Sequence, residues 1–101
     1  TKITESNFKQ EVLLSDKRTV LDFYADWCGP CQMLSPLMDK LAQAHPEWKF
    51  CKTDVDEAPL LATRFGVSVI PTVAVFNAGE LLDTFTGYQE EPEIENFIRN
   101  A

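Results

Sequence analysis

Residues 19–31 read TVLDFYADWCGPC and join an apolar run to a pair of cysteines. Residues 19–25 are nearly all apolar and do not alternate with polar residues. This pattern is typical of a strand buried on both faces, as in the centre of a partly parallel sheet. After the cysteines, apolar residues recur at helical spacing to about Ala44. The segment therefore predicts a buried strand that delivers two thiols to the start of a helix.

The remainder of the chain continues this alternation of strands and helices. We expect strands at Ile3 and over residues 19–25, 48–53, 72–76 and 81–86, and helices over residues 8–13, 28–44, 59–66 and from Pro92 onward. The expected inner stripe of the long helix is Met33, Leu34, Leu37, Met38 and Leu41. Pro36 lies inside this helix and is expected to kink it. The order of elements predicts a three-layer α/β domain with a mixed sheet.

Size and composition limit the class of protein. The chain has 101 residues, 45% of them apolar, which predicts one packed domain over residues 1–101. A net charge of −7 argues against nucleic acid or an anionic membrane as the main partner. No apolar run approaches the ~20 residues of a membrane span, and the N-terminus carries no secretory signal. Three cysteines are too few for a disulfide scaffold and predict a reducing compartment such as the cytoplasm.

Cys28 and Cys31 are spaced so that they can form a disulfide with each other. The thiolate is the attacking species in such chemistry, and a helix start favours an anion. We therefore expect Cys28 to have a lowered pKa and to act as the nucleophile. Cys31, one turn further along, is expected to be the resolving thiol. Pro30 fits the first helical turn and stiffens the segment between the two sulfurs.

Two other interpretations of the cysteines are open from the residues alone. The pair could form a structural disulfide, which the reducing composition disfavours. Cys28, Cys31, His45 and Cys51 also match the count of a Cys₃His zinc site, but Pro30 and the distance along the helix to His45 make one tetrahedral site awkward. We expect no metal site. Cys51 is expected to be a small buried apolar residue, and His45 to cap the helix end in solvent.

Motifs along the whole chain resemble those of the thioredoxin family. The block over residues 20–31 resembles its active site. Further matches, in the family's order and spacing, are Pro36, Asp54-Val55-Asp56, Gly66-Val67, Ile70-Pro71-Thr72, Gly79-Glu80 after Phe76, and Gly87. The resemblance implies a thioredoxin fold, with a central mixed β-sheet flanked by four helices. It also implies a protein-disulfide reductase that uses a redox-active Cys28–Cys31 disulfide.

The resemblance also implies the surroundings of the reaction. Such a protein takes part in electron transport and cell redox homeostasis in the cytoplasm. It binds no cofactor of its own and receives electrons from NADPH through thioredoxin reductase. Its other partners are disulfide-containing target proteins, and we expect a monomer. A protein that only binds partners through the same apolar surface, or a secreted relative that maintains exported thiols, are the alternatives.

Asp22 interrupts the apolar strand, and burial of a carboxylate raises its pKa. A perturbed acid near a reactive centre is a functional candidate, whereas an Asp at an open strand edge would have no such role. The resemblance implies that Asp22 lies beneath the dithiol and helps proton transfer at Cys31. It also implies that Lys52 neighbours this acid, although alternation with Phe50 would otherwise place Lys52 in solvent.

Pro71 precedes a buried strand and cannot donate to the ladder, so it marks an edge, a bulge or a special turn. The residues alone favour a trans bond, whereas the resemblance implies a cis bond that faces the dithiol. The backbone of Ile70 could then pair with an extended substrate. The expected substrate-binding collar is Trp27, Gly29, Pro30, Val69, Ile70, Pro71 and Gly87. Departures from the family pattern are Gln32 in place of Lys or Arg, Tyr24 in place of Trp, and the bulky Val69 and Tyr88.

Overall fold

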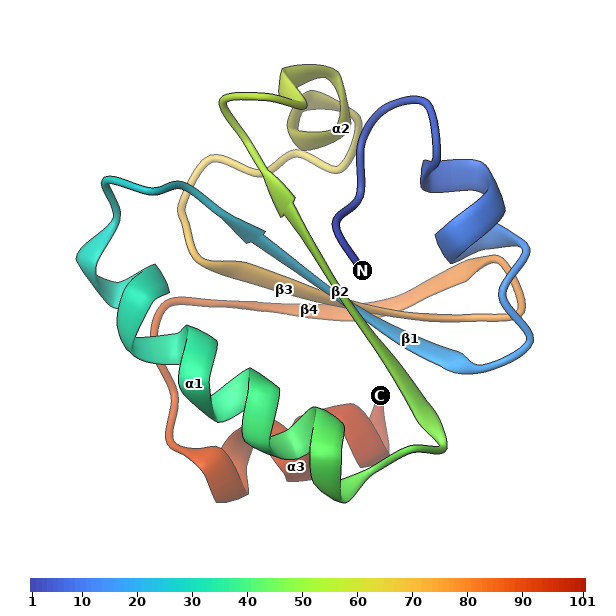
Figure 1. Cartoon of the computed structure of the whole chain (residues 1–101), viewed down its shortest axis with the longest axis vertical. Helices are drawn as coiled ribbons and strands as arrows, with labels where there is room; N and C mark the ends of the chain where they lie inside the picture. The colour runs from blue at the N-terminus through green and yellow to red at the C-terminus, as the bar shows by residue number, and fades with distance from the viewer.

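The computed structural model describes residues 1–101 and contains one four-stranded mixed sheet (Figure 1). The strands are β1 (Arg18–Tyr24), β2 (Trp48–Asp54), β3 (Thr72–Asn77) and β4 (Glu80–Thr86), in the spatial order β2-β1-β3-β4. β1 pairs with β2 in parallel and with β3 antiparallel, and β3 pairs with β4 antiparallel. The predicted buried strand is therefore confirmed as a central strand with a neighbour on each side.

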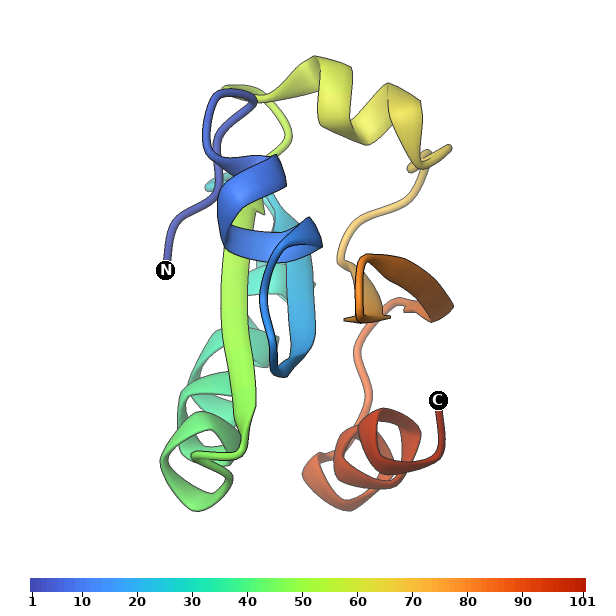
Figure 2. The ribbon, with the colours of Figure 1, turned by 90° about the vertical axis from the view of Figure 1, so that its right-hand side faces the viewer.

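Four helical segments cover the two faces of this sheet. They are η1 (Lys9–Leu13), α1 (Gly29–Ala44), α2 (Pro59–Arg64) and α3 (Glu91–Asn100). In Figure 1, α1 and α3 lie on one side of the sheet, while α2 and the N-terminal segment lie on the other. Figure 2 shows the same division from the edge. None of these helices has the length and apolar content needed to cross a membrane.

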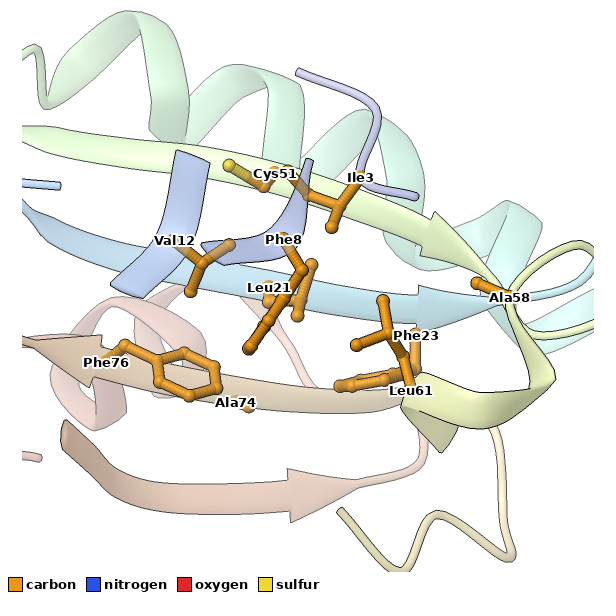
Figure 3. Close-up of a cluster of buried hydrophobic side chains, with 10 residues drawn as sticks. All are labelled: Ile3, Phe8, Val12, Leu21, Phe23, Cys51, Ala58, Leu61, Ala74 and Phe76. Atoms are coloured by element: carbon orange, nitrogen blue, oxygen red, sulfur yellow. The ribbon is translucent and has the colours of Figure 1, made fainter. Parts of the chain in front are cut away.

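Side chains of β1 alternate between the two helical layers, as the two-residue period of a strand requires. Leu21 and Phe23 point into an apolar cluster with η1 and α2, shown in Figure 3. Val20 belongs to the second cluster, which contains Leu34 and Ile94 from α1 and α3. Asp22 shares the parity of Val20 and lies on this second face, where α1 passes over it. The alternation thus places the carboxylate in the same layer as the helix that begins after Cys28.

Two details of the predicted elements are wrong, and a third has an unexpected form. Ile3 is buried, but its segment forms only an isolated parallel bridge between Lys2 and Lys52, too short to be a fifth strand. The short first helix is confirmed as a helix, but it is a five-residue π-helix, with Phe8 and Val12 buried. Met33 is 60% exposed, because it lies at the edge of the inner stripe whose buried members in α1 include Leu34, Met38 and Leu41.

Candidate active site

A disulfide between Cys28 and Cys31 lies at the N-terminus of α1. Cys28 is the N-cap residue, with φ −91° and ψ 108°, so its backbone is still extended where the helix begins. The backbone N–H of Cys31 donates a hydrogen bond to Cys28 Sγ at 3.2 Å. Pro30 occupies the first turn, where a missing N–H leaves no helical hydrogen bond unmade. The two Cα atoms are 5.2 Å apart, so the predicted pairing within the motif is confirmed.

The helix start favours negative charge on the sulfur of Cys28. Unpaired backbone N–H groups and the positive end of the helix dipole converge there. The hydrogen bond from the N–H of Cys31 acts in the same direction, because a thiolate is a stronger acceptor than a thiol. Little surface of either residue is open, with Cys28 5% and Cys31 3% exposed. The disulfide therefore offers one narrow face to a partner.

Asp22 is a buried carboxyl group on β1, beneath α1. Its residue surface is 6% exposed, and no protein group lies within hydrogen-bond distance of Oδ1. Burial raises the pKa of this carboxyl to about 7, and the positive charge of Lys52 opposes part of that rise. Lys52 is the register partner of Asp22 across the β1–β2 pair, and its side chain is exposed. The two residues are therefore neighbours, and Asp22 can change its charge near neutral pH.

An open cleft connects Asp22 with the disulfide. It has a volume of about 270 Å³, and Asp22, Cys31, Ser35 and Lys52 all contribute to its wall. A smaller cavity of about 100 Å³ adjoins it and shares Asp22, Ser35 and Lys52. Polar walls and this volume suit water molecules, which need two to four polar partners each. The arrangement allows a proton to move between the buried carboxyl group and the inner cysteine.

The surface around Cys28 is apolar and open. Trp27 is 70% exposed, and its Nε1–H donates a hydrogen bond to Asp56 Oδ2 at 2.8 Å, which fixes the indole plane. Val69 is also exposed, and Gly29 and Pro30 lie at the exposed start of α1. Trp27, Gly29 and Pro30 are contiguous with Cys28 in the chain, and Val69 directly precedes Ile70, which packs against the two cysteines.

The loop before β3 supplies the other side of this surface. The Ile70–Pro71 peptide bond is cis, so the expectation that came from the resemblance is confirmed. The carbonyl oxygen of Ile70 lies 3.8 Å from Cys28 Sγ. Gly87 has φ +83° and donates its N–H to the carbonyl of Pro71 at 2.8 Å. The left-handed backbone at this position favours glycine. The hydrogen bond holds the end of β4 against this loop.

The other thiol and the histidine lie apart from the disulfide, although Cys51 is among the residues that line the smaller cavity. Cys51 points into the cluster beneath η1, and burial raises the pKa of its thiol. His45 is the C-cap residue of α1, as predicted. Its side chain is only 12% exposed, so the expectation of a solvent-facing cap is wrong. It stacks on Trp48 and bridges Glu47 and Glu95.

These positions bear on the zinc alternative. No three or more His, Cys, Asp or Glu side chains are grouped so that they could share a metal ion. Cys28, Cys31, His45 and Cys51 therefore do not form the Cys₃His set that their count allowed.

Sequence reasoning assigned no contact to three residues of this site. Gln32 donates a hydrogen bond from Nε2 to the carbonyl of Asp26 at 2.7 Å, across the turn that carries Trp27. Asp56 holds the indole of Trp27, and Ser35 lines both cavities at Asp22. The helical spacing of Cys31 and Ser35, four residues apart, was the available signal for Ser35. The contacts of Gln32 and Asp56 depend on loop geometry and left no signal in the sequence.

Comparisons with known proteins agree with this geometry. The family model for thioredoxin matches residues 1–100. Thioredoxin from Rickettsia felis is 38% identical over 98% of this chain and 95% of its own length, and thioredoxin 1 from Nostoc sp. is 43% identical over 84% and 80%. The crystal structure of oxidised mitochondrial thioredoxin 3 from Saccharomyces cerevisiae has a TM-score of 0.90 at 37% identity, covering 100% of this chain and 94% of that one. The chain belongs to the thioredoxin family and is a thiol–disulfide oxidoreductase whose redox-active pair is Cys28 and Cys31.

Proposed function

We propose that this chain, as a single domain over residues 1–101, reduces disulfides in target proteins with Cys28 as the nucleophile and Cys31 as the resolving thiol. The hydrogen bond from the N–H of Cys31 to Cys28 Sγ carries this assignment of roles. Only Cys28 occupies the N-cap position, where the helix dipole favours a thiolate. Cys31 lies inside the first turn, behind Cys28 as seen from the apolar surface.

The reaction proceeds in two exchanges. The Cys28 thiolate attacks one sulfur of the target disulfide, which forms a mixed disulfide and releases the other target sulfur as a thiolate. Cys31 then loses its proton and attacks Cys28 Sγ. The Cys28–Cys31 bond forms, the mixed disulfide breaks, and the second target sulfur leaves as a thiolate. The target gains two electrons, and the two cysteines of this chain are oxidised.

Asp22 is the proton acceptor for Cys31 in this proposal, and Lys52 is its charged neighbour. A carboxyl with a pKa of about 7 can both take and return a proton near neutral pH. Asp22 and Cys31 line one cleft, so water can carry the proton between them. Lys52 stabilises the ionised form of Asp22 from the adjacent strand.

The collar predicted from the sequence is the proposed docking surface for the target. Its exposed apolar members, Trp27 and Val69, offer contact area beside the outer sulfur. The backbone of Ile70 lies next to Cys28 Sγ and can pair with an extended substrate segment. Gly29 and Pro30 at the start of α1, and Pro71 and Gly87, which are joined by a backbone hydrogen bond, complete the collar.

The oxidised chain needs a source of electrons. Members of this family work with thioredoxin reductase, and we propose that such a reductase renews the Cys28–Cys31 dithiol with electrons from NADPH. We further propose that the chain acts as a monomer in the cytoplasm and serves electron transport and cell redox homeostasis. The balance of two thiols to one disulfide requires no bound cofactor on this chain.

Reduction of insulin disulfides, with dithiothreitol as the electron donor, tests the assignment. Cys28→Ser is expected to abolish the activity, and Cys31→Ser to accumulate a covalent adduct with the substrate. Cys51→Ala is the matched control, because Cys51 is buried on the other face of the sheet, and it is expected to retain activity. Activity that persists in Cys28→Ser would show that the nucleophile is wrongly assigned.

A further inference from the structure

Ser35 is the one hydroxyl group among the residues of α1 that line the cavities at Asp22. It lies four residues after Cys31, so the two side chains share one face of the helix. Its side chain is half-buried, and no protein group is bonded to its hydroxyl. The hydroxyl can therefore both donate and accept within the cavities.

The buried carboxylate of Asp22 has no hydrogen-bond donor at Oδ1, and Ser35 can help to place one there. Asp22 Oδ1 has no protein partner, although buried polar atoms are nearly always hydrogen-bonded. Lys52, the charged neighbour, has an exposed side chain, so it acts on the carboxylate only through its positive charge at the surface. A water molecule in the cleft can satisfy Oδ1, but it needs further protein partners to remain in place. Gln32 on α1 also lines the larger cavity, but its Nε2 is bonded to the carbonyl of Asp26, and of these two neutral polar residues only Ser35 lines both cavities.

We propose that Ser35 is a positioning residue that orders the water connecting Asp22 Oδ1 with the thiol of Cys31. This inference rests on the role of Asp22 in the proposed function. In the resolving step, the Cys31 thiol gives its proton to this water, and the water gives one of its own to the Asp22 carboxylate. The Cys31 thiolate then forms a bond to Cys28 Sγ and breaks the mixed disulfide. Ser35 itself is neither oxidised nor deprotonated.

Other ionisable groups face these cavities and enter any pH profile. They come from β1 and its following loop, from α1, from β2 and from the N-terminus: Tyr24, Asp26, Cys31, Asp39, Lys52 and the amino group of Thr1. Cys51 also lines the smaller cavity, but its side chain packs in the apolar cluster beneath η1. A neutral substitution at Ser35 leaves all of these charges unchanged. Variants at Ser35 therefore report on the hydroxyl and not on the net charge of the cleft.

The test measures the two thiol exchanges separately by stopped-flow absorbance. The reduced protein, in a Cys51→Ala background, reacts with 5,5′-dithiobis(2-nitrobenzoate). Attack by Cys28 releases the first nitrothiobenzoate, and attack by Cys31 releases the second. Ser35→Ala is expected to slow the second release about five-fold, the worth of one neutral hydrogen bond, with the first release unchanged. Ser35→Thr keeps the hydroxyl and is expected to restore the rate to within about two-fold of that of the background protein.

Asp22→Asn, alone and combined with Ser35→Ala, tests whether the two residues act through the same water. It is expected to slow the second release more than Ser35→Ala does, and adding Ser35→Ala to it is expected to cause no further loss, because both act through one water. A full rate in Ser35→Ala, an equal loss in Ser35→Thr, or the same five-fold loss on top of Asp22→Asn would each overturn the inference. If Asp22→Asn keeps the full rate of the second release, the proposed role of Asp22 is wrong, and so is this inference. If Asp22→Asn slows the second release while Ser35→Ala does not, only the role of Ser35 is wrong.

Discussion

The two faces of the sheet are both covered by helices, but they differ in the side chains that fill the space beneath those helices. Beneath η1 and α2, aromatic rings fill the layer, with Phe8 and Phe65 at 5.4 Å and Phe65 and Phe76 at 5.5 Å between ring centroids. Beneath α1 and α3, the same sheet carries Asp22 and the cleft that leads to Cys31. Burial of an unpaired carboxylate costs stability, which apolar packing elsewhere must offset. Both faces therefore carry an apolar core, but only the face beneath α1 and α3 also holds a buried carboxylate.

The two inner cysteines show the same contrast. Cys51 lies in the apolar layer, where burial raises the pKa of its thiol and makes it less reactive. Cys31 is equally buried on the other side of the sheet, but it lies at the start of α1, is bonded to Cys28 and lines the larger cleft with Asp22, whereas Cys51 lines only the smaller cavity. Burial alone therefore does not distinguish the two thiols. In the proposed function, the helix start and the cleft to Asp22 set Cys31 apart.

Phe23→Ala gives the largest expected change in stability. Phe23 has no exposed surface and contacts the ring of Phe65 in the apolar layer, with centroids 6.3 Å apart. Removal of a buried phenyl ring is expected to lower the free energy of unfolding by about 4 kcal/mol. Urea titration of the oxidised protein measures this loss. A loss below about 1 kcal/mol would show that this layer is not the main source of stability.

Asp22→Asn is expected to change stability in the opposite direction. Because burial raises the pKa of Asp22 to about 7, the folded protein binds its proton more tightly than the unfolded chain does. Stability therefore falls as the pH rises from about 4 to about 7 and is level above that. The substitution removes this penalty, so its gain is expected to be about 3 kcal/mol larger at about pH 8.5 than at about pH 4.5. Thermal or urea unfolding at the two pH values measures the difference, and a gain independent of pH would contradict it.

Cys51→Ser tests the apolar layer with a smaller change. The hydroxyl is nearly isosteric with the thiol, but it is more polar and would lie among Val12, Leu21 and other apolar side chains. We expect a loss of about 2 kcal/mol in the free energy of unfolding, from a buried hydroxyl without a partner. The rate of insulin reduction by the folded protein is expected to stay unchanged. Cys51→Ala, which buries no polar atom, is the control, and an equal loss in both variants would contradict this reason.

Much of this division could be predicted from the sequence, because it depends on periodicity. The run over residues 19–25 predicted a central strand, whereas the place of Asp22 beneath the dithiol came from the family resemblance. In the structure, the two-residue period of the strand puts Asp22 on the face opposite Leu21 and Phe23. The predicted strand at Ile3 was wrong, because an apolar residue buried beside an isolated bridge has the same local pattern as a short strand. The predicted burial of Met33 was wrong, because helical spacing shows which residues share a stripe but not how far the buried part of that stripe extends.

The site was predictable to a smaller extent. The cysteine spacing indicated the disulfide, and the helix that follows indicated the N-cap position of Cys28. The cis bond before Pro71 came from the family resemblance, because the residues alone favour trans. Contacts between segments distant in the chain, such as Trp27 with Asp56, needed the structure. Such contacts depend on the closure of loops, which no local pattern encodes.

His45→Gln gives the smallest expected effect and tests whether the second face is also the pH-sensitive one. His45 joins the end of α1 to α3, with Nδ1 2.9 Å from Glu47 Oε2 and Nε2 2.5 Å from Glu95 Oε2. The hydrogen bonds to Glu47 and then to Glu95 raise the pKa of His45, so the protonated form stabilises the folded state. That contribution is complete below the unfolded value of about 6.5 and is lost as the pH rises through the raised value.

The substitution is therefore expected to lower the Tm more at about pH 5.5 than at about pH 9. Calorimetry at both pH values measures the two shifts, and Arg99, which also contacts Glu95 and Trp48, stays in place in both. Lys49→Gln is the matched control, because Lys49 pairs with Glu11 next to the apolar layer and has no contact with His45 or α3. Equal shifts for His45→Gln at both pH values would mean that stacking on Trp48, at the start of β2, and not the charged contact with Glu95, accounts for the contribution of His45.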